Sequence, residues 1–151
     1  MITTDRAVRG EIDILVRAMT VTQALTDVAQ MRQWWGIEQG LVEERADGTW
    51  AVAWNQPDDP AGHVVLCGTI RSLRHSSHLH VQRMVHARAG QPILGPISFV
   101  FEARERGTST HLTVSHEGFG TGPDWDAYRE LALTSWPRDL ARLKAFLERP
   151  R

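Results

Sequence analysis

Residues 109–128 read STHLTVSHEGFGTGPDWDAY, and this stretch joins a strand to a helix. In its first part Leu112, Val114 and His116 fall on one face, which is the period-two pattern of a half-buried strand over 109–117. The glycine-rich segment 118–122 then ends the alternation, and Pro123 suits the first position of a helix. We therefore expect the chain to finish as a strand followed by a long helix.

After Pro123, apolar residues recur at the spacing of an α-helix. Asp124 and Asp126 are favourable at the positive end of the helix dipole. Pro137 predicts a kink, because its ring removes one backbone donor. The predicted apolar stripe consists of Tyr128, Leu131, Leu133, Trp136, Leu140, Leu143, Phe146 and Leu147.

Upstream of this junction, the pattern predicts one strand, two short helical turns and then a meander. Alternation over 11–18 gives the first strand, and helical spacing over 21–35 gives two short turns, the second capped by Asp27. Turn-forming residues then recur every ten to fifteen positions, which is typical of antiparallel strands joined in order. The predicted strands cover 38–45, 48–55, 63–74, 78–88 and 96–105, in addition to 109–117.

Composition narrows the class of protein. The chain has 151 residues, which fits a single domain over 1–151 with its core at about 10–148. Its 17 basic and 18 acidic residues are spread evenly, which argues against a nucleic acid or an anionic membrane surface as partner. The sequence holds neither a run of about 18 apolar residues nor an apolar leader, so we expect no membrane span and a cytoplasmic location. Cys67 is the only cysteine, so an internal disulfide is excluded.

Several residue groups in this order resemble one known superfamily. They are Ala24-Leu25-Thr26-Asp27, Gln33-Trp34-Trp35, Gly48-Thr49-Trp50, Gly68-Thr69-Ile70, the stretch 107–119, and Trp136 with Leu140, Leu143 and Leu147. The sequence resembles the START-like (SRPBCC) superfamily over residues 10–148, most closely the branch named after the C-terminal domain of the activator of the heat-shock-protein-90 ATPase. The resemblance implies an α+β helix-grip fold: a curved antiparallel sheet, in β-αα-β6-α order, wrapped around a long C-terminal helix. It also implies a cavity between sheet and helix, but leaves function open, because relatives include lipid carriers, hormone receptors and polyketide cyclases.

Three histidines close together, His75, His78 and His80, raise the question of a metal site. Side chains two apart on a strand point the same way and can share an ion. The alternation, however, places His78 and His80 with Gln82 on the face opposite the apolar residues, and acidic or cysteine ligands at a matching spacing are lacking. We therefore predict neither a metal nor a cofactor.

The same alternation places Arg83 between Val81 and Val85 on the apolar face, and His116 on the corresponding face of its own strand. A guanidinium in an apolar cavity favours a carboxylate or phosphate partner. The alternative is an arginine at the cavity rim, directed outward or paired with Glu130. His116 is a weak candidate for a general base, against the alternative of a satisfied polar residue at the end of a strand.

Aromatic residues complete the expected cavity, because aromatic walls with few polar groups are typical of small-molecule pockets. The glycine-rich loop 118–122 does not fit phosphate binding, since Pro123 removes an amide and Asp124 and Asp126 repel anions. We expect that loop to gate the cavity mouth. The predicted cavity residues are Trp54, Arg83, Phe101, His116, Tyr128 and Trp136.

These features favour a non-catalytic carrier or sensor that binds a small apolar or amphipathic molecule. One alternative is a cyclase- or dehydratase-like enzyme that uses His116 as acid or base beside Arg83 as anion stabiliser. Another is a protein-interaction, co-chaperone-like module that uses exposed sheet or loop surface, although the sequence names no protein partner.

Overall fold

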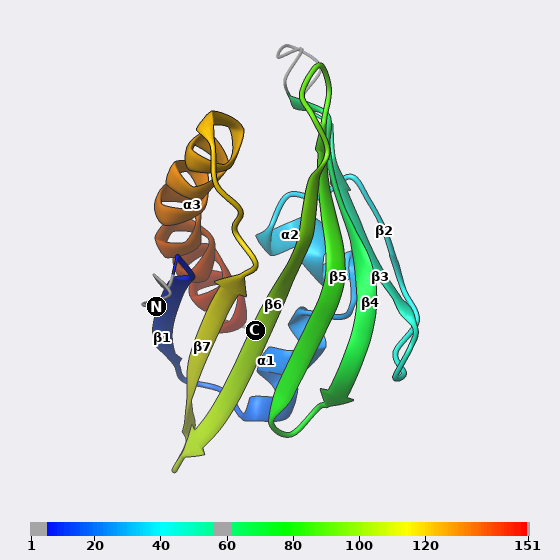
Figure 1. Cartoon of the computed structure of the whole chain (residues 1–151). Helices are drawn as coiled ribbons and strands as arrows, with labels where there is room; N and C mark the ends of the chain where they lie inside the picture. Colours follow the sequence, from blue (N-terminus) through cyan, green and yellow to red (C-terminus); the bar gives the residue numbers. More distant parts are fainter. Residues whose placement is uncertain (1–5, 56–61, 151) are drawn as a thin grey trace, which may run out of the picture.

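The computed structural model describes residues 6–55 and 62–150. In chain order the elements are β1 (Val8–Ile14), α1 (Ala18–Ala24), α2 (Val28–Trp34), β2 (Gln39–Val42), β3 (Thr49–Trp54), β4 (Val64–Arg74), β5 (His78–Arg88), β6 (Leu94–Arg106), β7 (Ser109–Glu117) and α3 (Pro123–Leu147). The described strands form one antiparallel sheet in the order β1-β7-β6-β5-β4-β3-β2. The sheet is curved, and the three helices lie on one side of it (Figure 1). The predicted helix-grip fold is confirmed.

Predicted and observed elements differ mainly at the start of the chain. The first strand ends at Ile14, earlier than predicted, because α1 begins at Ala18, whose backbone N–H donates to Oε1 of Glu105 at 3.0 Å. The predicted cap of α2 is confirmed, since the Asp27 carboxylate accepts from the backbone N–H of Gln30 at 3.2 Å. The other strands begin and end within a few residues of their predicted positions.

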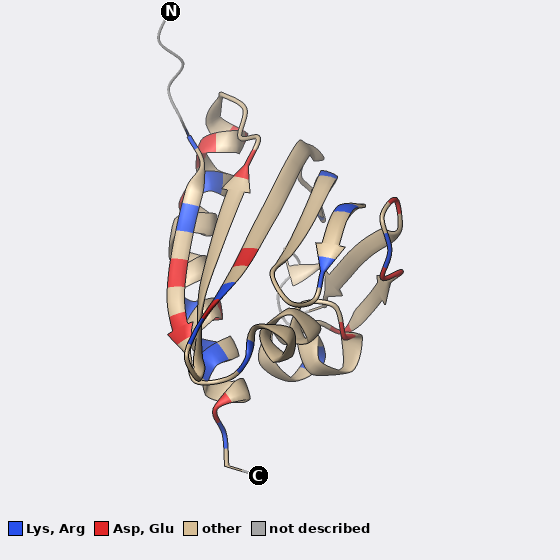
Figure 2. Cartoon of the chain, turned by 90° about the horizontal axis from the view of Figure 1, so that it is seen from below, with Lys and Arg blue, Asp and Glu red and all other residues tan. Residues whose placement is uncertain are grey.

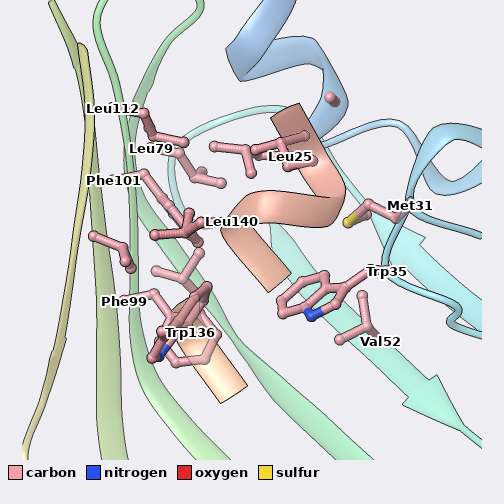
Figure 3. Packing of buried hydrophobic residues seen from close by; sticks show 14 of the residues in the cluster. Leu25, Met31, Trp35, Val52, Leu79, Phe99, Phe101, Leu112, Trp136 and Leu140 are labelled. Atoms are coloured by element: carbon pink, nitrogen blue, oxygen red, sulfur yellow. The ribbon is translucent and has the colours of Figure 1, made fainter. Parts of the chain in front are cut away.

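The core lies between the concave face of the sheet and α3. Along β7 every second residue from Thr110 to His116 is buried, as the alternation predicts. Figure 3 shows Phe99 and Phe101 of β6 beside Trp136 of α3, and the ring centroids of the two phenylalanines lie 5.2 and 5.8 Å from that of Trp136. The helix therefore packs its aromatic residue into the centre of the sheet.

The buried stripe of α3 differs in part from the prediction. Leu131 and Leu133 are 43% and 41% exposed, so their placement in the stripe was wrong. The buried face is narrower and includes the charged Asp139, which the apolar pattern could not indicate. The helix runs on through Pro137. Its buried residues are Tyr128, Ala132, Trp136, Asp139, Leu140 and Leu143.

The edge strand β1 is held by β7 on one side and by α3 on the other. Nζ of Lys144 donates to the backbone oxygen of Asp13 at 2.7 Å, and the carboxylate of Glu148 accepts from the backbone N–H of Leu15 at 2.8 Å. Gly10 permits the close approach, because a Cβ there would lie 2.9 Å from Cδ1 of Leu140. These contacts fix the helix across the end of the sheet.

A bulge in β5 changes which of its side chains face the helix. Val81 pairs with Phe99, but the next pair towards the end of the strand joins Met84 to Ile97, so β5 holds one extra residue. Arg83 takes up that residue with a left-handed backbone, at φ 52°. After a bulge the inward and outward positions exchange. Gly68 on β4 makes room for the bulge, because a Cβ there would lie 2.8 Å from the backbone oxygen of Gln82.

Charged residues are dispersed over the molecule, and Figure 2 shows basic and acidic positions interspersed along the chain, with neither sign collected into a stripe. Within residues 6–55 and 62–150, the helices are too short or too polar to cross a membrane.

Candidate functional site

The candidate site is a cavity of about 400 Å³ between α3 and the concave face of β3, β4 and β5. Its lining combines apolar and aromatic side chains with polar and charged side chains of β5, β7 and α3. The lining includes Trp35, Trp54, Val64, Leu66, His86, Arg88, Phe99, His116, Tyr128, Leu131, Ala132, Ser135, Trp136, Arg138, Asp139 and Arg142.

Indole rings make up one wall of the cavity. The ring of Trp35 stacks on Trp34 at 4.9 Å between centroids and meets the edge of Trp54 at 5.1 Å. The indole N–H of Trp35 donates to Oδ2 of Asp139 at 3.1 Å, and that of Trp54 donates to the backbone oxygen of Trp35 at 3.0 Å. With their N–H groups used inside the protein, these rings present carbon surface to the cavity.

His116 lies at the inner end of the cavity with both ring nitrogens engaged. The indole N–H of Trp136 donates to Nδ1 of His116 at 3.1 Å, and Nε2 of His116 lies 3.0 Å from the hydroxyl oxygen of Tyr128. Because an indole nitrogen can only donate, Nδ1 must be unprotonated, and the proton of the neutral imidazole is then on Nε2. His116 therefore donates to Tyr128.

The protonation states of this group follow from burial. His116 is 3% exposed, and its burial, with a smaller contribution from nearby His86, lowers the pKa of His116 to about 3. Burial raises the pKa of Tyr128 well above its ordinary value. Near neutral pH the imidazole of His116 is uncharged and the Tyr128 hydroxyl keeps its proton.

His86 is a second histidine of the cavity, and sequence reasoning missed it. It is 7% exposed, and its ring lies 4.3 Å from that of Tyr128. Burial, followed by the charge of Arg88, lowers the pKa of His86 to about 4. In the described part of the chain, its ring nitrogens have no hydrogen-bond partner. The one sequence signal for its position is Gly68, which accommodates the bulge that turns His86 inward.

The structure brings four of the six predicted cavity residues together: Trp54, His116, Tyr128 and Trp136 line the cavity. Phe101 is buried in the core beside Trp136 and lies outside the lining.

The predicted inward position of Arg83 was wrong. Arg83 is exposed and absent from the cavity wall, because the bulge that it occupies moves Met84 and His86 inward and leaves Val85 exposed. An anion held by Arg83 inside the cavity is therefore not available as a binding mode.

The predicted position of the histidines on β5 is confirmed. Leu79 and Val81 are fully buried on the concave side, whereas His78 and His80 lie in a separate depression on the other face. There His78 contacts the hydroxyls of Ser72 and Ser77 at 3.0 and 3.1 Å. Within residues 6–55 and 62–150, no group of three His, Cys, Asp or Glu side chains is arranged to hold a metal ion.

Solved structures with the same fold come from several bacteria. MLL2253 from Mesorhizobium loti is 18% identical, matches over 96% of this chain and 98% of that chain, and superposes with a TM-score of 0.74. The Aha1 dimer from Colwellia psychrerythraea is 18% identical over 94% and 96% of the two chains, with a TM-score of 0.68. CalU16 from Micromonospora echinospora is 17% identical over 94% and 74%, with a TM-score of 0.68. At these identities the likeness shows the shared fold alone.

A comparison with curated protein sequences gives no match. A family model does match, and it covers residues 16–148, from just before α1 to just after the end of α3. The superfamily resemblance seen in the sequence is thereby confirmed. The chain belongs to the family of Activator of Hsp90 ATPase homolog 1-like proteins (AHSA1).

Proposed function

We propose that this protein binds a small apolar or amphipathic molecule in the cavity between sheet and α3, as a non-catalytic carrier or sensor. The observation that carries the proposal is a cavity of about 400 Å³ lined in part by aromatic rings, whose indole N–H groups are already bonded within the protein. Ligand pockets of roughly 300–1,000 Å³ with mostly apolar walls are typical of small-molecule sites.

The composition of the walls supports an apolar body for the ligand. Burying apolar surface is worth about 25 cal/mol per Å², and the rings of Trp35, Trp54 and Phe99 offer such surface. Arg138 and Arg142 lie at the border of the cavity with side chains 54% exposed, so a polar end of the ligand can stay hydrated there. An amphipathic molecule fits both regions.

The geometry around His116 argues against the cyclase- or dehydratase-like alternative. A general base needs a free lone pair within reach of its substrate. The lone pair of His116 accepts from Trp136, and its other nitrogen donates to Tyr128. Arg83, the anion stabiliser of that alternative, lies outside the cavity. A binding role needs neither group as a catalyst.

The proposal is tested by filling the cavity. Val64 lines it from β4, and the next residue, Val65, is 41% exposed on the other face of the same strand. Val64→Trp should reduce the binding of fluorene, a rigid three-ring hydrocarbon, at least about tenfold, because the new ring occupies the space. Val65→Trp is the matched control and should bind fluorene as the wild type does. Equilibrium dialysis measures both.

Native mass spectrometry of the protein purified from its own host tests the same point for the natural ligand. A small molecule retained by the wild type and by Val65→Trp, but lost from Val64→Trp, would support the proposal. Failure of fluorene to bind the wild type, or equal binding by Val64→Trp, would contradict it.

A further inference from the structure

The O–H bond of Tyr128 has a fixed direction, because two hydrogen bonds that begin at the buried Trp136 determine it. The indole N–H of Trp136 can only donate, so Nδ1 of His116 accepts and Nε2 of His116 carries the proton. That proton is donated to the hydroxyl oxygen of Tyr128 at 3.0 Å. The hydroxyl hydrogen of Tyr128 must therefore point away from His116.

This hydrogen has no acceptor in the described part of the protein. Among the described residues, the partner of the Tyr128 hydroxyl is Nε2 of His116, which is itself the donor. Tyr128 is 7% exposed and lines the cavity. Buried hydroxyl groups are nearly always satisfied, because an unpaired one costs free energy. Whatever fills the cavity must supply the acceptor.

The surroundings of the hydroxyl favour an uncharged acceptor. His116 and His86, the ionisable groups beside Tyr128, are both neutral near pH 7, since burial lowers the pKa of each. The guanidinium groups of Arg138 and Arg142 lie at the exposed border of the cavity. Arg88 also lines the cavity, but the ionisable groups in direct contact with Tyr128 are the two neutral imidazoles, so a carboxylate there would lose its hydration without a cation against it, which is costly. A carbonyl oxygen loses far less.

We propose that the ligand of this cavity is a carbonyl compound, a ketone, ester or amide on an apolar framework, whose oxygen accepts a hydrogen bond from Tyr128. This inference rests on the proposed function, because it concerns the same cavity. The chain from Trp136 through His116 to Tyr128 aligns successive donors, and aligned hydrogen bonds strengthen one another. Trp136 and His116 act through Tyr128 as positioning residues.

The test uses two probes that differ only in the acceptor: fluorenone carries a carbonyl where fluorene has a methylene. Tyr128→Phe should weaken fluorenone binding about three- to tenfold, the loss of one neutral hydrogen bond. It should change fluorene binding less than about twofold, because the ring remains in place. Equilibrium dialysis of both probes gives the ratio of affinities for the wild type and the variant.

A second variant tests the direction of the hydrogen bonds from Trp136 through His116 to Tyr128. Trp136→Phe keeps an aromatic ring but frees Nδ1 of His116, which can then carry the proton while Nε2 accepts from Tyr128. The hydroxyl hydrogen turns away from the cavity, and the preference for fluorenone should fall although Tyr128 is unchanged. Nitrogen-15 NMR of the imidazole should show the proton on Nε2 in the wild type and on Nδ1 in the variant.

One measurement needs no variant. The carbonyl stretch of fluorenone bound to the wild type should lie at lower wavenumber than in a hydrocarbon solvent, as a hydrogen-bonded carbonyl does.

An unshifted stretch, or an unchanged affinity ratio in Tyr128→Phe, overturns the carbonyl anchor. An unchanged ratio in Trp136→Phe overturns its orientation by His116. If fluorene fails to bind the wild type, the proposed function falls; if it binds and fluorenone gains nothing from Tyr128, only the carbonyl inference does.

Discussion

At the scale of single residues, His116 and His86 are held as neutral imidazoles inside the protein, with pKa values lowered to about 3 and about 4. An unfolded chain exposes both to water, where a histidine titrates near pH 6.5. The unfolded state therefore binds protons as the pH falls below about 6.5, while the folded state does not until about pH 4 or lower. The stability from these residues is complete above about pH 6.5 and is lost as the pH falls towards about 3.

Replacing His116 by glutamine should flatten this pH dependence. The amide can accept from Trp136 and donate to Tyr128, but it does not titrate. Each buried histidine contributes a slope of about 1.4 kcal/mol per pH unit, so between pH 5.5 and 4 the wild type should lose about 2 kcal/mol more than His116→Gln. Urea denaturation at several pH values measures the difference. His63→Gln, at an exposed residue, should keep the wild-type profile.

Arg83 gives a prediction about the backbone, since its left-handed φ of 52° is strained for any residue with a Cβ. The strain costs about 1–2 kcal/mol, and glycine relieves it at an entropic cost of about 0.5–1 kcal/mol. Arg83→Gly should therefore stabilise the protein by up to about 1 kcal/mol, whereas the β-branched Arg83→Val should destabilise it by more than about 1 kcal/mol. Both should bind fluorene normally. A valine variant more stable than the glycine variant would contradict the bulge.

At the scale of elements, the sequence predicts the strands well wherever the alternation is unbroken. From Thr110 to His116 the predicted and observed faces agree, because β7 has no bulge. In β5 the prediction holds up to Val81 and is then inverted, because one extra residue in a strand exchanges its two faces. The bulge is defined by backbone dihedrals, which the alternation of side chains does not report, and its local sequence sign is a glycine on the neighbouring strand, Gly68.

The same limit applies to the candidate site. Trp54, Tyr128 and Trp136 could be assigned to the cavity because each lies on the apolar face of its own element. His86 could not, because its position depends on the bulge. Asp139 could not either, since its burial depends on a contact with Trp35, more than a hundred residues away in the chain. The periodicity of apolar residues describes one helix or strand at a time. The burial of His86 and Asp139 depends on a second element as well.

Trp136 should be the most important residue of α3 for stability. It is 4% exposed, packs against Phe99 and Phe101, and donates to His116. Trp136→Ala should destabilise the fold by about 3–5 kcal/mol, through the lost transfer energy and the space left behind. Leu133→Ala, on the exposed side of the same helix, is the control and should cost less than about 1 kcal/mol. Chemical denaturation compares them, and equal losses would contradict the packing of α3.

At the scale of the whole molecule, the sheet and α3 meet closely at one end and stand apart at the other. Near the end of α3, Lys144 and Glu148 bond to the backbone of β1 and the loop after it. Towards its start, Tyr128 and Ala132 border the cavity together with the ends of β3 and β4. Protein interiors are otherwise close-packed. The side chains that line a cavity of about 400 Å³ therefore lack van der Waals contacts that would have stabilised the fold.

If the cavity serves binding, filling it should raise stability while removing function. Val64→Trp would add apolar surface inside the cavity, and burial of roughly 50–100 Å² corresponds to about 1–2 kcal/mol of added stability. Val65→Trp, on the exposed face, should add little. Urea midpoints with unchanged denaturant dependence would measure both variants.

A Val64→Trp protein destabilised by more than about 1 kcal/mol would mean that the space is too small or misshapen for a ring, because overpacking a filled core costs about 1–3 kcal/mol. A gain in stability together with lost fluorene binding would instead show that this end of the fold is kept open for a ligand.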